Sequence, residues 1–338
     1  MNTSKLHILV TGGTGYIGSH TVIELLEQGH TVTIIDNLVN SQLSVLDKIT
    51  QITGKKPDFH EIDLLDADSL DQLFDQTSFD LVIHFAGLKA VAESIKKPLK
   101  YYDNNITGTI NLLKSMQSHS VKNLIFSSSA TVYGDQAKDG KCTETIQTGI
   151  GITNPYGKTK YMIEEILKDL AASDPEFNII ALRYFNPVGN HSSGLLGENP
   201  NGIPNNLMPY IMKVASGELK ELRIFGNDYD TKDGTCQRDF IHVVDLAKGH
   251  LAAIQGLKPG FNVYNLGTGH PTSVYEMVTA FEENSGRSLP HSFAPRRPGD
   301  LAILYADPTK AEKELNWHAD LTISDAIKDI LTFIEKQS

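Results

Sequence analysis

The segment from Thr11 to Gly18 constrains the fold of this chain more than any other part of the sequence. Gly12, Gly15 and Gly18 form a G-x-x-G-x-x-G pattern directly after an apolar run at residues 6–10. Glycines in this context let the chain turn tightly and let backbone N–H groups approach a pyrophosphate at the N-terminus of the following helix. The pattern therefore predicts a strand, a dinucleotide-binding turn and a helix, in that order.

Up to about residue 185, short β-branched runs alternate with amphipathic stretches. This alternation predicts an α/β fold, a Rossmann-type doubly wound parallel sheet with helices on both faces. We expect strands at residues 6–10, 31–35, 59–62, 80–84, 122–127 and 177–183, and helices at 15–28, 66–75, 100–118 and 156–171. Residues 1–185 are therefore expected to form a dinucleotide-binding domain.

The character of the sequence changes at about Asn186. Residues 186–206 are rich in proline, glycine and asparagine, which indicates a long loop that is ordered or becomes ordered around a ligand. We expect further helices at 206–217, 243–254, 273–285 and 323–335, and strands at 222–225 and 262–266. Residues 186–338 should form a smaller α/β lobe that binds the substrate, with 240–270 as a candidate to return to the first sheet.

Composition excludes several classes of partner. The formal net charge of -11 argues against nucleic acid and anionic membrane surfaces, because both require clustered basic residues. The two cysteines, Cys142 and Cys236, show no metal-ligand spacing, so we expect no metal site, and their scarcity suits a reducing compartment. The apolar run at 6–10 is far shorter than a signal or membrane segment. The expected location is the cytoplasm.

Arginine is distributed unevenly along the chain. All six arginines follow residue 180. A planar guanidinium is the preferred bidentate ligand for phosphate, so an acidic protein that holds an anionic substrate would place arginines in its substrate half. Surface scatter is the alternative for any one of them. Arg238 and Arg297 are the two that we predict to bind the substrate.

Carboxylates at strand ends bear on the choice of cofactor. Asp36 follows Gly18 by 18 residues and ends the second predicted strand, where a carboxylate accepts hydrogen bonds from the adenosine ribose and repels a 2′-phosphate. This favours NAD over NADP. Asp63 ends the third strand, near the adenine position, or is simply a solvated strand end. The small residues of Phe85-Ala86-Gly87 would let the backbone lie against the cofactor.

Tyr156, Lys160 and Ser129 supply a proton-transfer centre to complement the dinucleotide turn. Tyr156 and Lys160 are four residues apart, so they share one face of a helix. A tyrosine hydroxyl has a pKa of about 10, and a nearby lysine ammonium together with an oxidised nicotinamide would favour its phenolate. Ser129 would hydrogen-bond the substrate oxygen that loses or gains the proton. Taken alone, the Tyr-x-x-x-Lys pair is more often a helix-surface pair.

These motifs resemble the extended short-chain dehydrogenase/reductase family, and most closely its branch that epimerises UDP-sugars. The resemblance covers nearly the whole chain and is carried by residues 11–18, 84–91, 101–105, 127–134, 154–158, 183–189, 203–210 and 294–297. It implies transient oxidation of the sugar at C4 by NAD, rotation of the 4-keto sugar, and return of the hydride to the opposite face. UDP-glucose and UDP-galactose are the implied substrates.

The resemblance also implies site residues. Tyr156 is the implied base, Lys160 binds the nicotinamide ribose and tunes Tyr156, and Ser129 assists proton transfer. The implied NAD contacts are these three and Gly12, Gly15, Tyr16, Ile17, Gly18, Asp36, Asn37, Asp63, Leu64, Phe85, Ala86, Gly87, Lys89, Asn104 and Tyr184. The implied UDP-sugar contacts are Lys89, Ser129, Tyr156, Phe185, Asn186, Asn206, Leu207, Phe225, Arg238, Arg297, Asp300 and Leu304. Asn186 and Asn206 could instead cap turns, and Phe225 could be core.

Two expectations complete the resemblance. Relatives pair helices that correspond to residues 100–118 and 156–171 across a two-fold axis, which implies a homodimer. Leu304 stands where epimerases restricted to glucose and galactose carry tyrosine, so N-acetylated UDP-hexoses are candidate substrates unless Tyr305 fills the gap.

Two alternatives to an epimerase remain. One is a nucleotide-sugar 4,6-dehydratase or decarboxylase, which is disfavoured because Ala130 and Thr131 replace an acidic residue. The other is a non-catalytic NAD-binding regulator.

Overall fold

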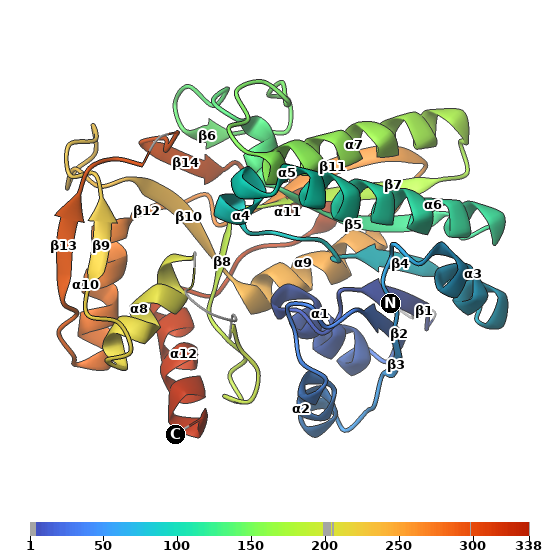
Figure 1. The fold of residues 1–338 in the computed structure, drawn as a ribbon, viewed down its shortest axis with the longest axis horizontal. Coiled ribbons are helices and arrows are strands. Elements are labelled where there is room, and N and C mark those ends of the chain that lie inside the picture. The colour runs from blue at the N-terminus through green and yellow to red at the C-terminus, as the bar shows by residue number, and fades with distance from the viewer. Residues whose placement is uncertain (1–4, 199–203, 205, 298, 338) are drawn as a thin grey trace.

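A parallel sheet of seven strands forms the centre of the molecule, in the order β11-β7-β5-β4-β1-β2-β3 (Figure 1). The computed structural model describes residues 5–198, 204, 206–297 and 299–337. The strands are β1 (His7–Thr11), β2 (Thr31–Asp36), β3 (Asp58–Glu61), β4 (Leu81–His84), β5 (Asn123–Ser129), β7 (Asn178–Tyr184) and β11 (Gly260–Leu266). The strand order reverses its direction beside β1, which is where doubly wound folds bind their ligands.

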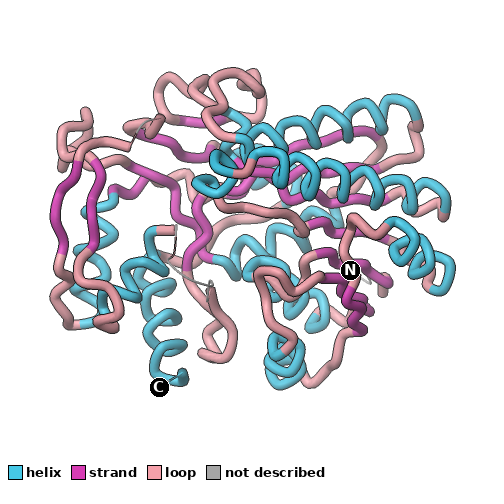
Figure 2. Tube along the Cα trace, in the orientation of Figure 1, coloured by secondary structure: helices cyan, strands magenta, loops and turns pink. Residues whose placement is uncertain are grey.

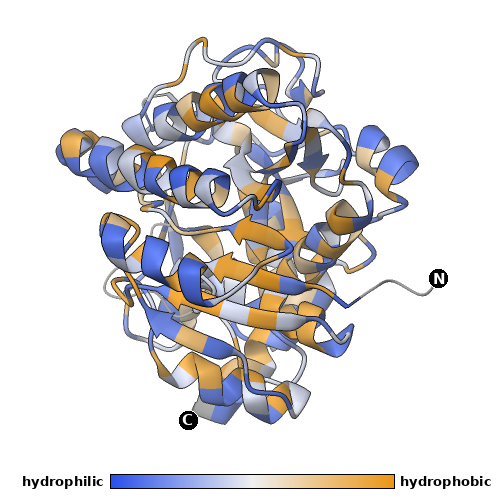
Figure 3. Ribbon diagram, turned by 90° about the vertical axis from the view of Figure 1, so that its right-hand side faces the viewer, coloured by the Kyte–Doolittle hydropathy of each residue, from blue (hydrophilic) through white to orange (hydrophobic). Residues whose placement is uncertain are grey.

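Helices cover both faces of this sheet because the strand side chains alternate between two apolar clusters. Ile8 and Val10 belong to one cluster, whereas Leu9 between them belongs to the other, and all three are fully buried. The first cluster lies under α1 (Tyr16–Glu27), α2 (Ser44–Thr53), α9 (Val243–Gln255) and α11 (Thr309–Leu315). The second lies under α3 (Ala67–Gln76), α6 (Gly108–Ser118) and α7 (Pro155–Ser173). Figure 3 shows the apolar strands enclosed between these helices.

The predicted elements of the first half are confirmed within a few residues, with one correction. The stretch 100–118 is not one regular α-helix: it is α5 (Pro98–Tyr102), a π-helical turn (Asp103–Thr107) and then α6. A π-turn inserts one extra residue per turn and is common at functional sites. Helix α2 and the short α4 (Val91–Lys96) were not predicted.

The smaller lobe lies to one side of the large sheet (Figure 1, Figure 2). Strand β9 (Leu222–Phe225) and the helices α8 (Leu207–Ala215), α10 (Val274–Ser285) and α12 (Ile323–Gln337) occur where predicted. These helices bury their apolar faces in a third cluster. In the described part of the chain, six strands were not predicted: β6 (Lys141–Cys142), β8 (Asn186–Val188), β10 (Gln237–His242), β12 (Pro271–Ser273), β13 (His291–Ala294) and β14 (Ile303–Ala306).

Two elements join the smaller lobe's part of the sequence to the large sheet. Strand β11 pairs in parallel with β7 over its whole length, and α9 packs against α1. None of the described helices is long and apolar enough to span a membrane. Part of the predicted loop, residues 199–203 and 205, lies outside the described residues. The division of ligand binding at residue 185 stays a prediction.

Candidate active site

The dinucleotide turn joins the carboxyl end of β1 to α1, and its glycines are required by close packing. Gly12 has a φ of +70°, and a Cβ placed there would lie 2.7 Å from the Ala86 nitrogen. A Cβ on Gly18 would lie 2.3 Å from the Gly12 carbonyl oxygen. Gly15 precedes the first turn of α1 and offers no side chain to cap its N–H groups. The start of α1 is thus left accessible to an anion, as a bound pyrophosphate requires.

Carboxylates at the ends of β2 and β3 define the next part of the site. Asp36 accepts hydrogen bonds from the Leu38 nitrogen at 3.0 Å and the Ser41 hydroxyl at 3.2 Å. Asn37 donates to Asp63 at 2.9 Å. The four polar residues of this group line the same cavity as the glycine turn. A fixed carboxylate beside the turn fits the adenosine ribose of NAD.

One cavity of about 1590 Å³ contains the whole predicted site. Every residue predicted to bind the cofactor or the substrate lines it. The cavity extends from the dinucleotide turn, past the carboxyl ends of β4 and β5, to the strands of the smaller lobe. The role of each residue in binding stays a prediction.

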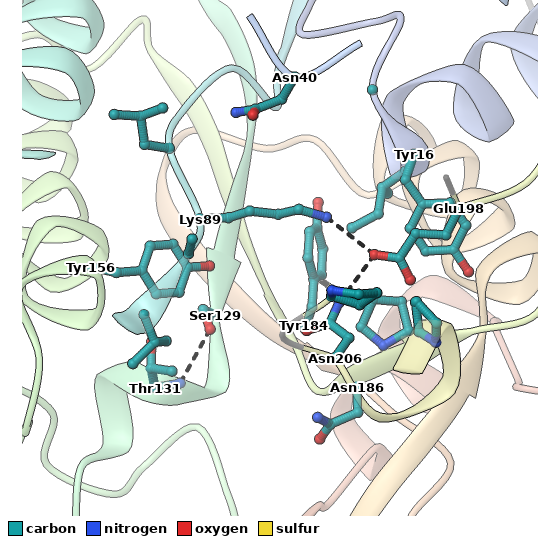
Figure 4. Close-up of a pocket in the computed structure, with 18 of the residues that line it drawn as sticks. Tyr16, Asn40, Lys89, Ser129, Thr131, Tyr156, Tyr184, Asn186, Glu198 and Asn206 are labelled. Carbon is teal, nitrogen blue, oxygen red and sulfur yellow. Dashed lines mark hydrogen bonds and ion pairs between the residues drawn. The ribbon is translucent and has the colours of Figure 1, made fainter. Parts of the chain in front are cut away.

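Tyr156 (Figure 4) and Lys160 lie on the first turns of α7. This helix begins where predicted because Pro155 fits its first turn and the Asn154 side chain accepts a hydrogen bond from the Gly157 nitrogen at 2.8 Å. The Lys160 ammonium donates to the carbonyl oxygen of Ser127, on β5, at 2.6 Å and to its hydroxyl at 3.2 Å. The proton-transfer centre is therefore held between the start of α7 and the end of β5.

In the protein alone the pKa of Tyr156 is not lowered, and the expectation that Lys160 together with an oxidised nicotinamide favours its phenolate stays a prediction. Burial raises the pKa of Tyr156 above its ordinary value, and a hydrogen bond with Ser129 opposes that rise. Burial also lowers the pKa of Lys160 to about 7, against the attraction of the Glu164 carboxylate. Both side chains are thus desolvated, and a further cation beside Tyr156 would have a large effect on its protonation.

A buried ion pair behind Lys160 was not predicted from the sequence. Arg183 donates from Nη2 to Glu164 Oε2 at 2.7 Å, and Ser128 donates from its hydroxyl to Glu164 Oε1 at 2.5 Å. Both charged side chains are almost fully buried. Glu164 therefore fastens α7 to β5 and β7. The signal was present, because Glu164 lies one turn after Lys160 among apolar residues of the helix.

The cavity end formed by the smaller lobe carries the two predicted arginines. Arg238 donates to the Leu301 carbonyl oxygen at 2.8 Å and approaches Asp300 Oδ1 at 3.4 Å. The Arg297 guanidinium lies 4.0 Å from the centre of the Phe225 ring. Two cationic groups therefore lie at this end of the cavity, and one of them, Arg297, stacks on an aromatic ring, which suits a nucleoside diphosphate.

Leu304 and Asn206 also lie in this end of the cavity. Leu304 on β14 is in register with Arg238 on β10, and the next residue, Tyr305, points to the other face of the strand and is not among the cavity-lining residues. Tyr305 therefore does not fill the space beside Leu304. Asn206 precedes α8 but makes no capping hydrogen bond; its amide donates to Glu198 instead.

Two further cavity residues were not predicted. Thr131 lines the cavity and its buried hydroxyl has no hydrogen-bond partner within the described part of the chain. Glu198 lines it as well, and its carboxylate meets Lys89 and Asn206 (Figure 4). Glu198 could have been noticed, because it is the one acidic residue in the segment 186–206.

Comparison with known proteins places this arrangement in a family. The profile of the NAD dependent epimerase/dehydratase family matches residues 8–267. The chain is 54% identical to the UDP-glucose 4-epimerase of Bacillus subtilis over 95% of each chain, and 56% identical to that of Dictyostelium discoideum over 95% and 94%. It superposes with a TM-score of 0.94 on the Bifidobacterium longum UDP-glucose 4-epimerase solved with NAD+ and UDP, at 54% identity and 98% coverage of both chains. The chain therefore belongs to the NAD-dependent epimerase/dehydratase family, within its UDP-glucose 4-epimerase branch.

Proposed function

We propose that this protein interconverts UDP-glucose and UDP-galactose by inverting C4 of the hexose. The observation that carries the proposal is the presence of Tyr156, Lys160 and Ser129 in the same cavity as the dinucleotide turn and the two arginines. The relatives from Bacillus subtilis and Dictyostelium discoideum carry this activity in their names. The cavity is large enough for a dinucleotide and a nucleotide sugar together.

The chain's own residues account for binding and proton transfer. NAD, when bound, supplies the hydride acceptor and donor for sugar C4. Tyr156 removes the proton of the 4-hydroxyl and later returns it, and Ser129 hydrogen-bonds the same oxygen as its charge changes. Lys160, in its protonated form, favours the phenolate of Tyr156. Arg238 and Arg297 would hold the nucleotide while the oxidised hexose turns over between the two half-reactions.

The rival reactions of the family fit these residues less well. A 4,6-dehydratase needs an acid beside the reacting serine or threonine to remove a C5 proton and expel the 6-hydroxyl. Ala130 and Thr131 occupy those positions, and neither carries a carboxylic acid that could remove the C5 proton and protonate the leaving 6-hydroxyl. A regulator without catalysis needs none of Tyr156, Lys160 and Ser129, yet all three face the cavity.

A direct test supplies the purified protein with UDP-galactose and follows two signals. NAD is regenerated in each cycle, so it should stay tightly bound to the purified protein. We therefore expect UDP-glucose to accumulate to equilibrium without added NAD. We also expect a small transient absorbance of reduced nicotinamide. Loss of the 6-hydroxyl from the product would establish the dehydratase instead, and the absence of both signals would support the regulator.

Substrate breadth is the finer part of the proposal. The wall at Leu304 lacks the ring and phenol of a tyrosine, and Tyr305 faces the other way. We therefore propose that the N-acetyl group of UDP-N-acetylglucosamine and UDP-N-acetylgalactosamine is also admitted. A single pocket wall usually contributes about 1–3 kcal/mol to the discrimination between two substrates. The preference for UDP-galactose over its N-acetylated counterpart should therefore be graded rather than absolute.

Leu304→Tyr should lower kcat/KM for UDP-N-acetylgalactosamine relative to UDP-galactose by about 10- to 100-fold. The measurement is the ratio of the two kcat/KM values in the parent and the variant. Tyr305→Phe, on the opposite face of β14, serves as the control and should leave the ratio unchanged. If the parent does not turn over UDP-N-acetylgalactosamine, or if Leu304→Tyr leaves the ratio of the two kcat/KM values unaltered, Leu304 does not control which sugars enter the site.

We also propose a homodimer formed by the helices around α6 and α7. Support comes from apolar side chains that remain exposed on α7 and on a helix beside it: Met162 on α7 is 40% exposed and Leu99 on α5 is 80% exposed. Exposed apolar residues that gather on adjacent helices mark interaction surfaces. A two-fold pairing would cover them.

Leu99→Glu should convert the dimer to a monomer, because it places a charge in an apolar interface. Sedimentation at micromolar concentration would measure the change. Leu43→Glu, at a residue 54% exposed near α2, is the matched control and should leave the dimer intact. A parent protein that sediments only as a monomer would refute the proposal.

The cytoplasm remains the proposed location. Both cysteines are free thiols buried in the fold, and neither forms a disulfide. Free thiols of this kind suit a reducing compartment. Fractionation of cells that express the protein would test the location.

A further inference from the structure

Glu198 is a carboxylate on the wall of the cavity for which the reaction above has no use. Its side chain is only 10% exposed. Burying a carboxylate is costly unless other groups compensate its charge and its hydrogen bonds. The segment 186–206 that carries it contains no lysine or arginine. The compensating groups must therefore come from elsewhere in the chain or from an amide.

Two donors from the two halves of the molecule reach the same oxygen of Glu198 (Figure 4). The Lys89 ammonium, which follows β4, lies 3.5 Å from Oε1, and the Asn206 amide, which precedes α8, donates to it at 3.1 Å. Both donors line the cavity. Oε2 has no hydrogen-bond partner among the residues that the structure describes. Glu198 thus joins two side chains that were predicted to bind ligand.

The backbone around Glu198 is itself anchored. Its nitrogen donates to the Asn190 amide oxygen at 3.0 Å, and Asn190 is 1% exposed. On the cofactor side, the Lys89 ammonium lies 5.9 Å from the centre of the Tyr16 ring, and the Tyr16 hydroxyl donates to the Gly189 carbonyl oxygen. Glu198 is therefore held in place, whereas the long side chain of Lys89 is 57% exposed and has many rotamers.

The negative charge of Glu198 indicates which part of the substrate this side of the cavity faces. A carboxylate repels a diphosphate, but it accepts hydrogen bonds from neutral sugar hydroxyls. A lysine without a carboxylate partner would be free to pair with the diphosphate instead. We propose that Glu198 is a positioning residue for the hexose: it keeps the Lys89 ammonium and the Asn206 amide at the sugar and away from the diphosphate. This inference rests on the proposed function.

The test compares Glu198→Gln with the parent holoenzyme, alone and combined with Lys89→Met. Glutamine keeps the shape and can still accept from Asn206, but it loses the charge that holds Lys89. We expect KM for UDP-galactose to rise about tenfold in Glu198→Gln, with kcat changed less than about threefold and NAD content unchanged. In the Lys89→Met background, the same substitution should change KM less than about twofold.

A binding measurement separates the sugar from the nucleotide. Calorimetry with UDP-glucose should show the weakened affinity of Glu198→Gln, whereas UDP alone should bind as in the parent or more tightly. Glu314→Gln is the matched control, because Glu314 pairs with Lys258 at 3.0 Å outside the cavity. It should leave every one of these values unchanged.

Several results would overturn the inference. They are an unchanged KM in Glu198→Gln, an equal effect in the two Lys89 backgrounds, or an equal loss of affinity for UDP and UDP-glucose. A lowered melting temperature with lost NAD and unchanged KM would show a merely structural role. A parent that does not interconvert the two sugars would defeat the proposed function, whereas a normal parent with an unaffected variant would defeat this inference alone.

Discussion

Replacing Tyr156 by phenylalanine should lower the turnover of UDP-galactose by about 10²- to 10⁴-fold, the range expected for the loss of a general base. The hydroxyl is the only group removed, and the ring still fills its half-buried position on α7. The glycine turn and Asp36 are untouched, so NAD should remain bound. The measurement is kcat at saturating UDP-galactose, together with the NAD content of the purified protein.

The control for this substitution is Tyr275→Phe, which removes an exposed hydroxyl on α10 outside the cavity. Its turnover should match that of the parent. Near-full turnover in Tyr156→Phe would mean that another group takes the proton, and the assignment of the base would be wrong.

Gly12→Ala should produce a protein that purifies with little NAD and turns over at least about 100-fold more slowly. A methyl group at this position would lie 2.7 Å from the Ala86 nitrogen. Either the dinucleotide turn or the loop that follows β4 must therefore move. The φ of +70° adds strain of about 1–2 kcal/mol for any residue with a Cβ. Both cofactor content and kcat would be measured.

Gly54→Ala separates the effect of backbone strain from the effect of the close contact with Ala86. Gly54 has nearly the same φ, +68°, but a methyl group there would meet no other atom within 4 Å. This control should lose a little stability and keep its NAD and its activity. If Gly12→Ala behaves like Gly54→Ala, the close approach of the turn to Ala86 does not matter for the cofactor.

The elements that the sequence predicted well are those whose signal is local. The strand, turn and helix around Gly12 depend on neighbouring residues, and strand β9 was predicted with its observed bounds. Strands such as β10 and β14 were missed because they pair with each other across a long sequence separation, Gln237 with Ile303. Short strands of this kind are stabilised by partners that no local pattern reveals.

The same contrast applies to the candidate site. Tyr156 and Lys160 were predicted because their spacing on one helix has a chemical meaning, and the structure places both in the cavity. Glu198 was missed because its meaning comes from Lys89 and Asn206, which lie far from one another in the sequence. Burial, which only the fold reveals, raises the pKa of Tyr156 in the protein alone, and the effect of Lys160 together with NAD stays a prediction.

The seventh strand of the large sheet has a consequence for how the chain acquires its structure. Strand β11 is synthesised long after β7, yet it completes the edge of the sheet beside it, and α9 arrives with it to cover α1. A nascent chain that ends near residue 185 would carry an unpaired edge and an uncovered apolar helix, both of which favour aggregation. Closing such distant contacts slows folding. The Rossmann sheet should therefore mature only after residue 266 has emerged, and an isolated fragment 1–185 should not be a stable NAD-binding unit.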